Sequence, residues 1–358
     1  MVWAPEAHFD RHLPFALLTG FLGSGKTTLL NRLLTDPRLR DTAVAINEFG
    51  DVALDQHFIV ARSEDVLVLA NGCLCCFAGG DLEQSLARIF SRRDDGEIPT
   101  FKRLIIETSG VADPEYVLQA ILDSPITSRF LWLDSVVTTV DSLFGAEQID
   151  RHAEALKQAR IADRLVITKS DLASADSLRQ VQARLREINP AAGQTVSVHA
   201  DIEPAELFSP TFFDEDGDSS LIGEWVTQAQ SQPGAGDAAA HDHATHARRH
   251  VNGIATLTLT ATAPLAWRTF DLWLSRTQRR YGDKLLRVKG IINVADCAQP
   301  VVVHGVQSVS HVPVALASWP DEDRRTRLVF IFRDLDRASL EQDWRTFLAT
   351  EQGTAERV

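Results

Sequence analysis

Short apolar runs alternate with amphipathic stretches through the first two hundred residues of the chain. The apolar runs have the length of buried strands, and the stretches between them repeat apolar residues at helical spacing. Strands are predicted at residues 13–19, 42–46, 65–70, 101–106, 130–140, 164–168 and 194–198. Helices are predicted at residues 27–34, 81–92, 114–122, 152–160 and 174–188. This alternation predicts an α/β domain with a mostly parallel sheet, whose ligands bind at the carboxyl ends of the strands.

The apolar periodicity stops near residue 213 and returns only after residue 250. Beyond it, strands are predicted at 254–261, 284–294, 300–306 and 327–333, with helices at 265–281 and 338–348. This order predicts a smaller C-terminal α+β domain. The expected organisation is therefore a P-loop domain at 1–212, a flexible linker at 213–250 and the α+β domain at 251–358. The linker contains a His run at 241–250, which is either a weak site for transition metals or simply polar chain.

Composition limits the compartment and the partners. The formal net charge of −13 over 358 residues argues against nucleic acid as the main partner. No window approaches the roughly 20 apolar residues of a membrane-spanning helix, and the first residues lack the layout of a signal peptide. We therefore expect a cytoplasmic protein with no membrane partner. Of four cysteines, three lie within four positions, which makes a disulfide framework improbable.

A glycine-rich loop follows the first predicted strand and fits the pattern G-x-x-x-x-G-K-[ST]. The residues expected to hold phosphates are Gly20, Gly23, Ser24, Gly25, Lys26, Thr27 and Thr28. Backbone N–H groups in such a loop and the start of the next helix attract anions. Lys26 then reaches the β- and γ-phosphates, while the Thr27 hydroxyl is a ligand for Mg²⁺. The loop therefore predicts a nucleoside triphosphate site.

The predicted strand at 164–168 ends in a sequence typical of guanine recognition. Asp171 can accept hydrogen bonds from the N1–H and the exocyclic amine of guanine, and the stem of Lys169 packs over the ring. Thr168 stands where asparagine is commoner. The alternative is an ordinary polar surface turn. The position after a buried strand favours GTP.

Two further segments are expected beside the phosphates. Glu107 ends an apolar strand, where a carboxylate holds Mg²⁺ through its water shell, and the N–H of Gly110 can sense the γ-phosphate. The alternative is a capped strand end followed by a turn. Residues 47–55 follow the second strand, where P-loop GTPases carry a switch segment, and include Glu48 and Asp51.

Cys73, Cys75 and Cys76 can present two or three thiolates to one metal ion. Zn²⁺ or Cu(I) suits thiolates best, with Co²⁺ or Ni²⁺ possible. A fourth ligand has to come from a carboxylate, a histidine, water or a partner, and Asp51 and Glu48 are the nearest candidates in the sequence. The alternatives are small buried side chains or a redox pair.

Together these residues resemble the CobW-type metallochaperone GTPases of the CobW/HypB/UreG class. The resemblance is carried by residues 20–30, 47–50, 73–76, 107–110 and 168–171, and it continues at 286–290 and 303–307. It implies GTP hydrolysis with Mg²⁺, binding of a transition metal (Zn²⁺ or Co²⁺), and transfer of that ion to a client metalloenzyme docked partly on the C-terminal domain. An oligomer stays possible.

One position departs from that family. Some members carry a glutamate directly before the Asn-Glu-Phe-Gly segment as a metal ligand, and here that position is Ile46. We therefore expect Asp51 to supply the oxygen donor, and we assign the catalytic roles to Lys26, Glu107 and Asp51. The alternatives are a nucleotide-switched regulatory GTPase without metal transfer, and a protein that inserts cobalt in a cobalamin-type biosynthesis.

Overall fold

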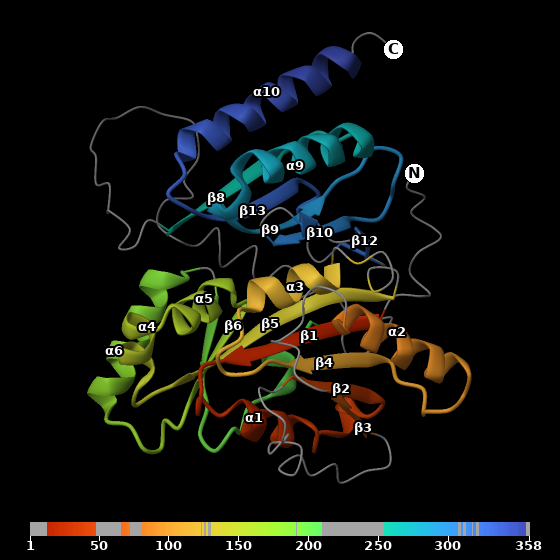
Figure 1. The fold of residues 1–358 in the computed structure, drawn as a ribbon. Coiled ribbons are helices and arrows are strands. Elements are labelled where there is room, and N and C mark those ends of the chain that lie inside the picture. The colour runs from red at the N-terminus through yellow and green to blue at the C-terminus, as the bar shows by residue number, and fades with distance from the viewer. Residues whose placement is uncertain are drawn as a thin grey trace. The chain divides into compact units, whose positions relative to one another are not determined.

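The structure is a computed structural model of the whole chain (Figure 1). It describes residues 13–47, 66–71, 81–122, 124, 127, 130–190, 192–209, 254–306, 309–310, 313–316, 318–319 and 322–355. The described residues fall into two compact units, within 13–209 and within 254–355, and each is described here by itself. The exact domain limits and the flexible linker given above remain predictions.

The N-terminal unit contains a seven-stranded sheet in the order β3-β2-β4-β1-β5-β6-β7. Its strands are β1 (Leu13–Gly20), β2 (Thr42–Asn47), β3 (Val66–Asn71), β4 (Arg103–Glu107), β5 (Leu131–Asp141), β6 (Arg164–Thr168) and β7 (Gly193–Val196). All neighbouring pairs run parallel. The carboxyl ends therefore share one edge, as predicted for the α/β class.

Helices connect these strands and cover both faces of the sheet (Figure 1). They are α1 (Lys26–Leu33), α2 (Asp81–Asp94), α3 (Pro114–Leu122), α4 (Gly145–Arg151), α5 (Ala153–Ile161) and α6 (Ala175–Ile188), with 3₁₀ turns at Pro37–Leu39 and Pro204–Glu206. On one face Leu30 of α1 packs in a cluster with Leu18 of β1. On the other, Ala159 of α5 and Leu185 of α6 pack with Leu165 of β6. Successive strand residues point to opposite faces, so these apolar strands are buried on both sides.

The C-terminal unit has a six-stranded sheet, ordered β11-β10-β9-β13-β8 with β12 paired to β10. Its strands are β8 (Ile254–Ala261), β9 (Leu285–Ile292), β10 (Val301–Val306), β11 (Val309–Ser310), β12 (Val314–Ala315) and β13 (Thr326–Arg333). All pairs are antiparallel. Helices α9 (Trp267–Tyr281) and α10 (Arg337–Ala355) share one apolar cluster with the sheet, in which Phe270 and Trp344 pack with Leu257. The predicted α+β class is confirmed.

Several element predictions were wrong in detail. Helix α4 was not predicted, because its only buried positions are Gly145 and Ile149, which leave little apolar periodicity. The two-residue strands β11 and β12 were missed because they are too short to show alternation. The strand predicted at 284–294 is shorter, since Gly282–Lys284 forms a 3₁₀ turn, and the last helix runs on to Ala355. Among the described residues, no helix is long and apolar enough to cross a bilayer.

Candidate functional site

The glycine-rich loop links β1 to α1, as its motif predicts. Gly20, Gly23 and Gly25 all have positive φ, of 144°, 71° and 92°, which residues with a side chain adopt only with strain. Below the loop, the hydroxyls of Ser24 and Thr139 lie 2.7 Å apart and are buried. The loop is therefore held to β5 while its backbone curves toward the start of α1, where backbone N–H groups attract anions.

The predicted triphosphate and Mg²⁺ ligands lie together at the carboxyl edge of the sheet. The ammonium of Lys26 donates to the backbone carbonyls of Gly20 and Phe21, at 3.0 and 3.4 Å. The Thr27 hydroxyl donates to Oε1 of Glu107 at 2.9 Å, across 80 positions of sequence. Glu107 ends β4 and is only 3% exposed, so its carboxylate is directed to this site by the strand. Two oxygen donors beside a phosphate loop form a fit for Mg²⁺.

The segment after Glu107 packs directly on the phosphate loop. A side chain at Gly110 would come within 2.7 Å of the backbone nitrogen of Leu22, so only glycine fits there. The hydroxyl of Thr108 donates to the hydroxyl of Thr19 at 2.8 Å. Gly110 is therefore beside the loop, where the γ-phosphate contact was predicted.

Helix α5 holds this same segment, and the sequence reasoning missed it. The side-chain amide of Gln158 donates to the carbonyls of Gly110 and Ala112, at 3.1 and 3.2 Å. Lys157 forms an ion pair with Asp113 at 2.5 Å, and this hydrogen bond raises the pKa of Lys157. The only hint in the sequence is an amide on the apolar face of an amphipathic helix.

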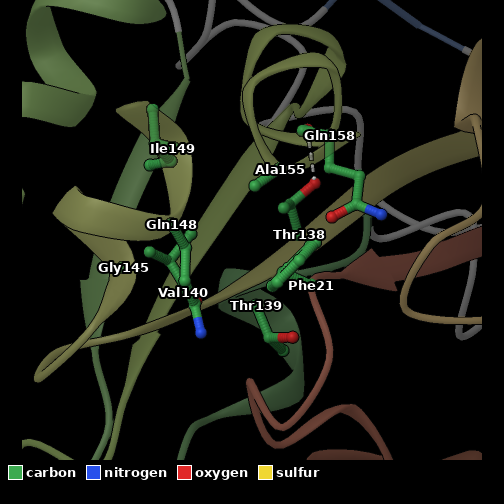
Figure 2. A pocket seen from close by; sticks show the side chains of 9 residues that line it. All are labelled: Phe21, Thr138, Thr139, Val140, Gly145, Gln148, Ile149, Ala155 and Gln158. Atoms are coloured by element: carbon green, nitrogen blue, oxygen red, sulfur yellow. Dashed lines mark hydrogen bonds between the residues drawn. The ribbon is translucent and has the colours of Figure 1, made fainter. Parts of the chain in front are cut away.

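Gln158 also borders a small pocket beneath the phosphate loop (Figure 2). The pocket is lined by Phe21, Thr138, Thr139, Val140, Gly145, Gln148, Ile149, Ala155 and Gln158. Phe21 enters from the loop and stacks on His152, with ring centroids 4.6 Å apart. Lys26, Thr27 and Asp171 are not among its lining residues, so the pocket is a packing gap and not the nucleotide site.

The predicted guanine residues lie at the end of β6, where Thr168 is the last residue, and directly after it. The Thr168 hydroxyl donates to the carbonyl of Ser24 at 2.7 Å, which connects this strand to the phosphate loop. Lys169 has a φ of 56° and pairs with the buried carboxylate of Asp141 at 2.6 Å. Oδ2 of Asp171 lies 3.8 Å from Nδ1 of the exposed His199. The structure thus brings Thr168 next to the loop and adds Asp141 and His199, which the motif did not indicate.

The predicted transition-metal ligands Cys73, Cys75, Cys76 and Asp51, together with Glu48 and the His run at 241–250, lie outside the described residues. Within the described part of the chain, no three His, Cys, Asp or Glu side chains gather as a metal site. The strands that lead to both segments are nevertheless adjacent. Asn47 at the end of β2 pairs in register with Asn71 at the end of β3, and Ile46 pairs with Glu107.

A parallel sheet with a glycine-rich phosphate loop, a Thr–Glu pair beside it and a Thr-Lys-x-Asp turn defines a P-loop nucleotide-binding protein. The chain belongs to the CobW/HypB/UreG family. The model of that family's nucleotide-binding domain matches residues 14–195, and the model of the cobalamin synthesis protein cobW C-terminal domain matches residues 254–348.

Relatives of known function cover nearly the whole chain. The zinc chaperone YjiA of Escherichia coli is 30% identical over 88% of this chain and 92% of its own length. The zinc chaperone CobW of Pseudomonas aeruginosa is 30% identical over 94% of this chain and 92% of its own. Among solved structures, a Zn(II)-bound triple mutant of YjiA GTPase superposes with a TM-score of 0.60 and 25% identity, over 94% of this chain and 99% of that one. The predicted family is confirmed.

Proposed function

We propose that this protein is a GTP-hydrolysing metallochaperone that binds a transition metal, Zn²⁺ first, and transfers it to client proteins. One observation carries the proposal. In a chain of the CobW/HypB/UreG family, the Thr27–Glu107 pair and the Thr168–Ser24 bond assemble the phosphate, Mg²⁺ and guanine motifs at one edge of the sheet. Relatives named zinc chaperones support the metal cargo.

The phosphates of GTP are held by the loop from Gly20 to Thr28, and its guanine base is contacted by Lys169 and Asp171. The ammonium of Lys26 donates to two carbonyls of the loop, so it already lies beside the place where the phosphates bind. When GTP binds, this ammonium exchanges the carbonyls for phosphate oxygens. Mg²⁺ is held by Thr27 and by Glu107, whose carboxylate is buried at 3% exposure and already oriented. When bound, Mg²⁺ neutralises charge on the β- and γ-phosphates. Lys26, Glu107 and Asp51 are assigned to hydrolysis.

The cargo metal is assigned to Cys73, Cys75 and Cys76, with Asp51 as the oxygen donor and Zn²⁺ or Co²⁺ as the ion. The register of β2 supports a coupling between this site and the nucleotide. Ile46 is the partner of Glu107, and the next residue, Asn47, is the partner of Asn71, two positions before Cys73. A change at the Mg²⁺ ligand is therefore transmitted over very few residues to both metal-binding segments.

Docking of the client protein is assigned partly to the C-terminal unit. The cytoplasm is the assigned compartment, since GTP and reduced thiols are both available there. A client metalloenzyme receives the ion when hydrolysis changes the segments that follow β2 and β4. Regulation of a partner by nucleotide state, without metal transfer, is the competing assignment.

The proposal is tested by measuring Zn²⁺ affinity of the full chain with a non-hydrolysable GTP analogue and with GDP. We expect at least tenfold tighter binding in the GTP form, a coupling in the range common for linked sites. Cys75→Ser should abolish the difference, while Cys297→Ser, which removes a thiol of the C-terminal unit, should leave it unchanged. Equal affinity in both nucleotide states would favour the regulatory GTPase, and the same measurement with Co²⁺ ranks the two ions.

A further inference from the structure

Asp141, the last residue of β5, is a buried carboxylate with two separate partners. Its Oδ1 accepts the backbone N–H groups of Leu143 and Phe144, at 2.7 and 3.3 Å. Its Oδ2 lies 2.6 Å from the ammonium of Lys169, and only 2% of the Asp141 side chain is exposed. A buried carboxylate stays charged only when it is paired with a cation and hydrogen-bonded. In Asp141, Oδ2 is paired with Lys169 and Oδ1 accepts the backbone hydrogen bonds.

The turn that begins at Asp141 also holds the backbone of the lysine. The N–H of Ser142 donates to the carbonyl of Thr168 at 3.1 Å, and its hydroxyl donates to the carbonyl of Lys169 at 2.9 Å. Asp141 and Thr168 are register partners in the sheet. Lys169 thus has both its backbone, with the left-handed φ of 56°, and its ammonium fixed by residues 141–142.

A free lysine side chain samples many rotamers, and binding otherwise has to overcome the entropy lost when one of them is fixed. Fixing the far end of the stem before the ligand arrives removes part of this cost. The Lys169 side chain is 36% exposed in this pair, so a ligand can still reach it.

We propose that Asp141 is a positioning residue for guanine recognition: it fixes the Lys169 side chain so that its stem is ready to pack along the base. This inference rests on the proposed guanine site. Asp141 acts through the lysine and does not touch the nucleotide. Because the base contacts are the same before and during hydrolysis, its loss should weaken GTP and GDP binding equally and leave kcat nearly unchanged.

Asp141→Asn is the variant that tests this, since the amide oxygen still accepts from Leu143 and Phe144 while the charge facing Lys169 is gone. Asp150→Asn is the matched control, because it removes the Asp150–Arg184 pair of 2.6 Å, which is outside the guanine motif. Kd is measured with fluorescent GDP and ADP on the full chain, together with KM and kcat for GTP. We expect about tenfold weaker GDP binding and a raised KM for Asp141→Asn, with ADP binding and kcat within twofold of the unsubstituted protein.

A double-mutant cycle covers the case in which Asp141→Asn fails to fold. Lys169→Met keeps an apolar stem, and Asp141→Asn with Lys169→Met leaves no unpaired charge. If Asp141 acts through the lysine, this double variant binds GDP as Lys169→Met alone does. GDP binding by Asp141→Asn within twofold of the unsubstituted protein, or a double variant several-fold weaker than Lys169→Met, overturns the inference. An unsubstituted protein that does not prefer GDP to ADP overturns instead the guanine assignment beneath it.

Discussion

Two threonine hydroxyls explain how distant motifs become one site. Thr27 bonds to Glu107 over 80 positions, and Thr168 bonds to the carbonyl of Ser24 over 144 positions. The second bond explains why threonine serves at a position where asparagine is commoner. The short hydroxyl reaches the glycine-rich loop directly, so the strand that leads to the predicted guanine residues is tied to the loop predicted to bind the phosphates. In the proposed site, recognition of the base is assigned to Lys169 and Asp171.

Asp171→Asn should reverse the preference for the base. An amide can donate to the 2-carbonyl of xanthine but cannot accept both guanine donors, so a buried donor of guanine is left unpaired. We expect kcat/KM for GTP to fall by at least about 100-fold and kcat/KM for XTP to rise. Competition between GTP and XTP hydrolysis measures this, with the exposed Asp176→Asn as the control. Unchanged GTP selectivity would contradict the guanine assignment.

Side chains of helix α5 hold the segment that follows β4 through hydrogen bonds and an ion pair. Gln158 and Lys157 are consecutive and lie on adjacent faces of the helix: the buried Gln158 donates to the carbonyls of Gly110 and Ala112, and the more exposed Lys157 pairs with Asp113. Gln158 is 1% exposed, so its amide donates these hydrogen bonds in a buried setting. Residues 110–113, which are expected to respond to the γ-phosphate, are therefore held in place by helix α5.

Gln158→Leu should destabilise the N-terminal unit. The carbonyls of Gly110 and Ala112 lose their amide donor in a buried setting, at a cost of about 1–3 kcal/mol. Urea unfolding of the full chain, followed with and without Mg²⁺ and GDP, measures the change. Gln180→Leu, on the exposed side of α6, is the control and should unfold like the unsubstituted protein. An unfolding midpoint for Gln158→Leu equal to that of the control would show that the hydrogen bonds of Gln158 do not contribute to stability.

The two units of the molecule have separate apolar cores and should respond separately to solution conditions. In the C-terminal unit, Tyr281 of α9 donates to Asp343 of α10 at 2.6 Å. Burial and this hydrogen bond raise the pKa of Tyr281 to about 12. Because the folded state holds the proton more tightly than the unfolded state, the stabilisation is complete below the ordinary tyrosine pKa near 10 and is lost as pH rises through about 12.

Calorimetry at pH 9, 10.5 and 11.5 tests that dependence. The transition of the C-terminal unit should lose roughly 1–2 kcal/mol of stability over this range beyond the general effect of alkali, because solvent screens part of the interaction and the titration is not complete at pH 11.5. Tyr281→Phe lacks the titrating hydroxyl and should be less stable at pH 9 but lose less as pH rises. The transition of the N-terminal unit should be the same in both proteins. A parallel pH dependence in the two proteins would remove Tyr281 as the cause.

Most of the architecture and the site motifs were predictable from local pattern. The seven parallel strands followed from apolar runs, and the loop from Gly20 to Thr28 followed from residue types that a tight, phosphate-binding backbone requires. Helix α4 was missed because its sequence has too few buried positions to show a period. The roles given to individual site residues remain predictions, and those of Asp51 and the three motif cysteines fall outside the described residues.

Residue order along the chain therefore sets which elements form and which side chains reach the carboxyl ends of the strands, because both depend on spacing over a few positions. Which strands become neighbours depends on packing and register between distant segments, and spacing does not encode that directly. Tertiary structure alone pairs Asp141 with Lys169, places Gln158 on Gly110, and aligns Asn47 with Asn71. The phosphate loop can be recognised from the local sequence. The contacts that position the residues around it form only when the distant strands pair into the sheet.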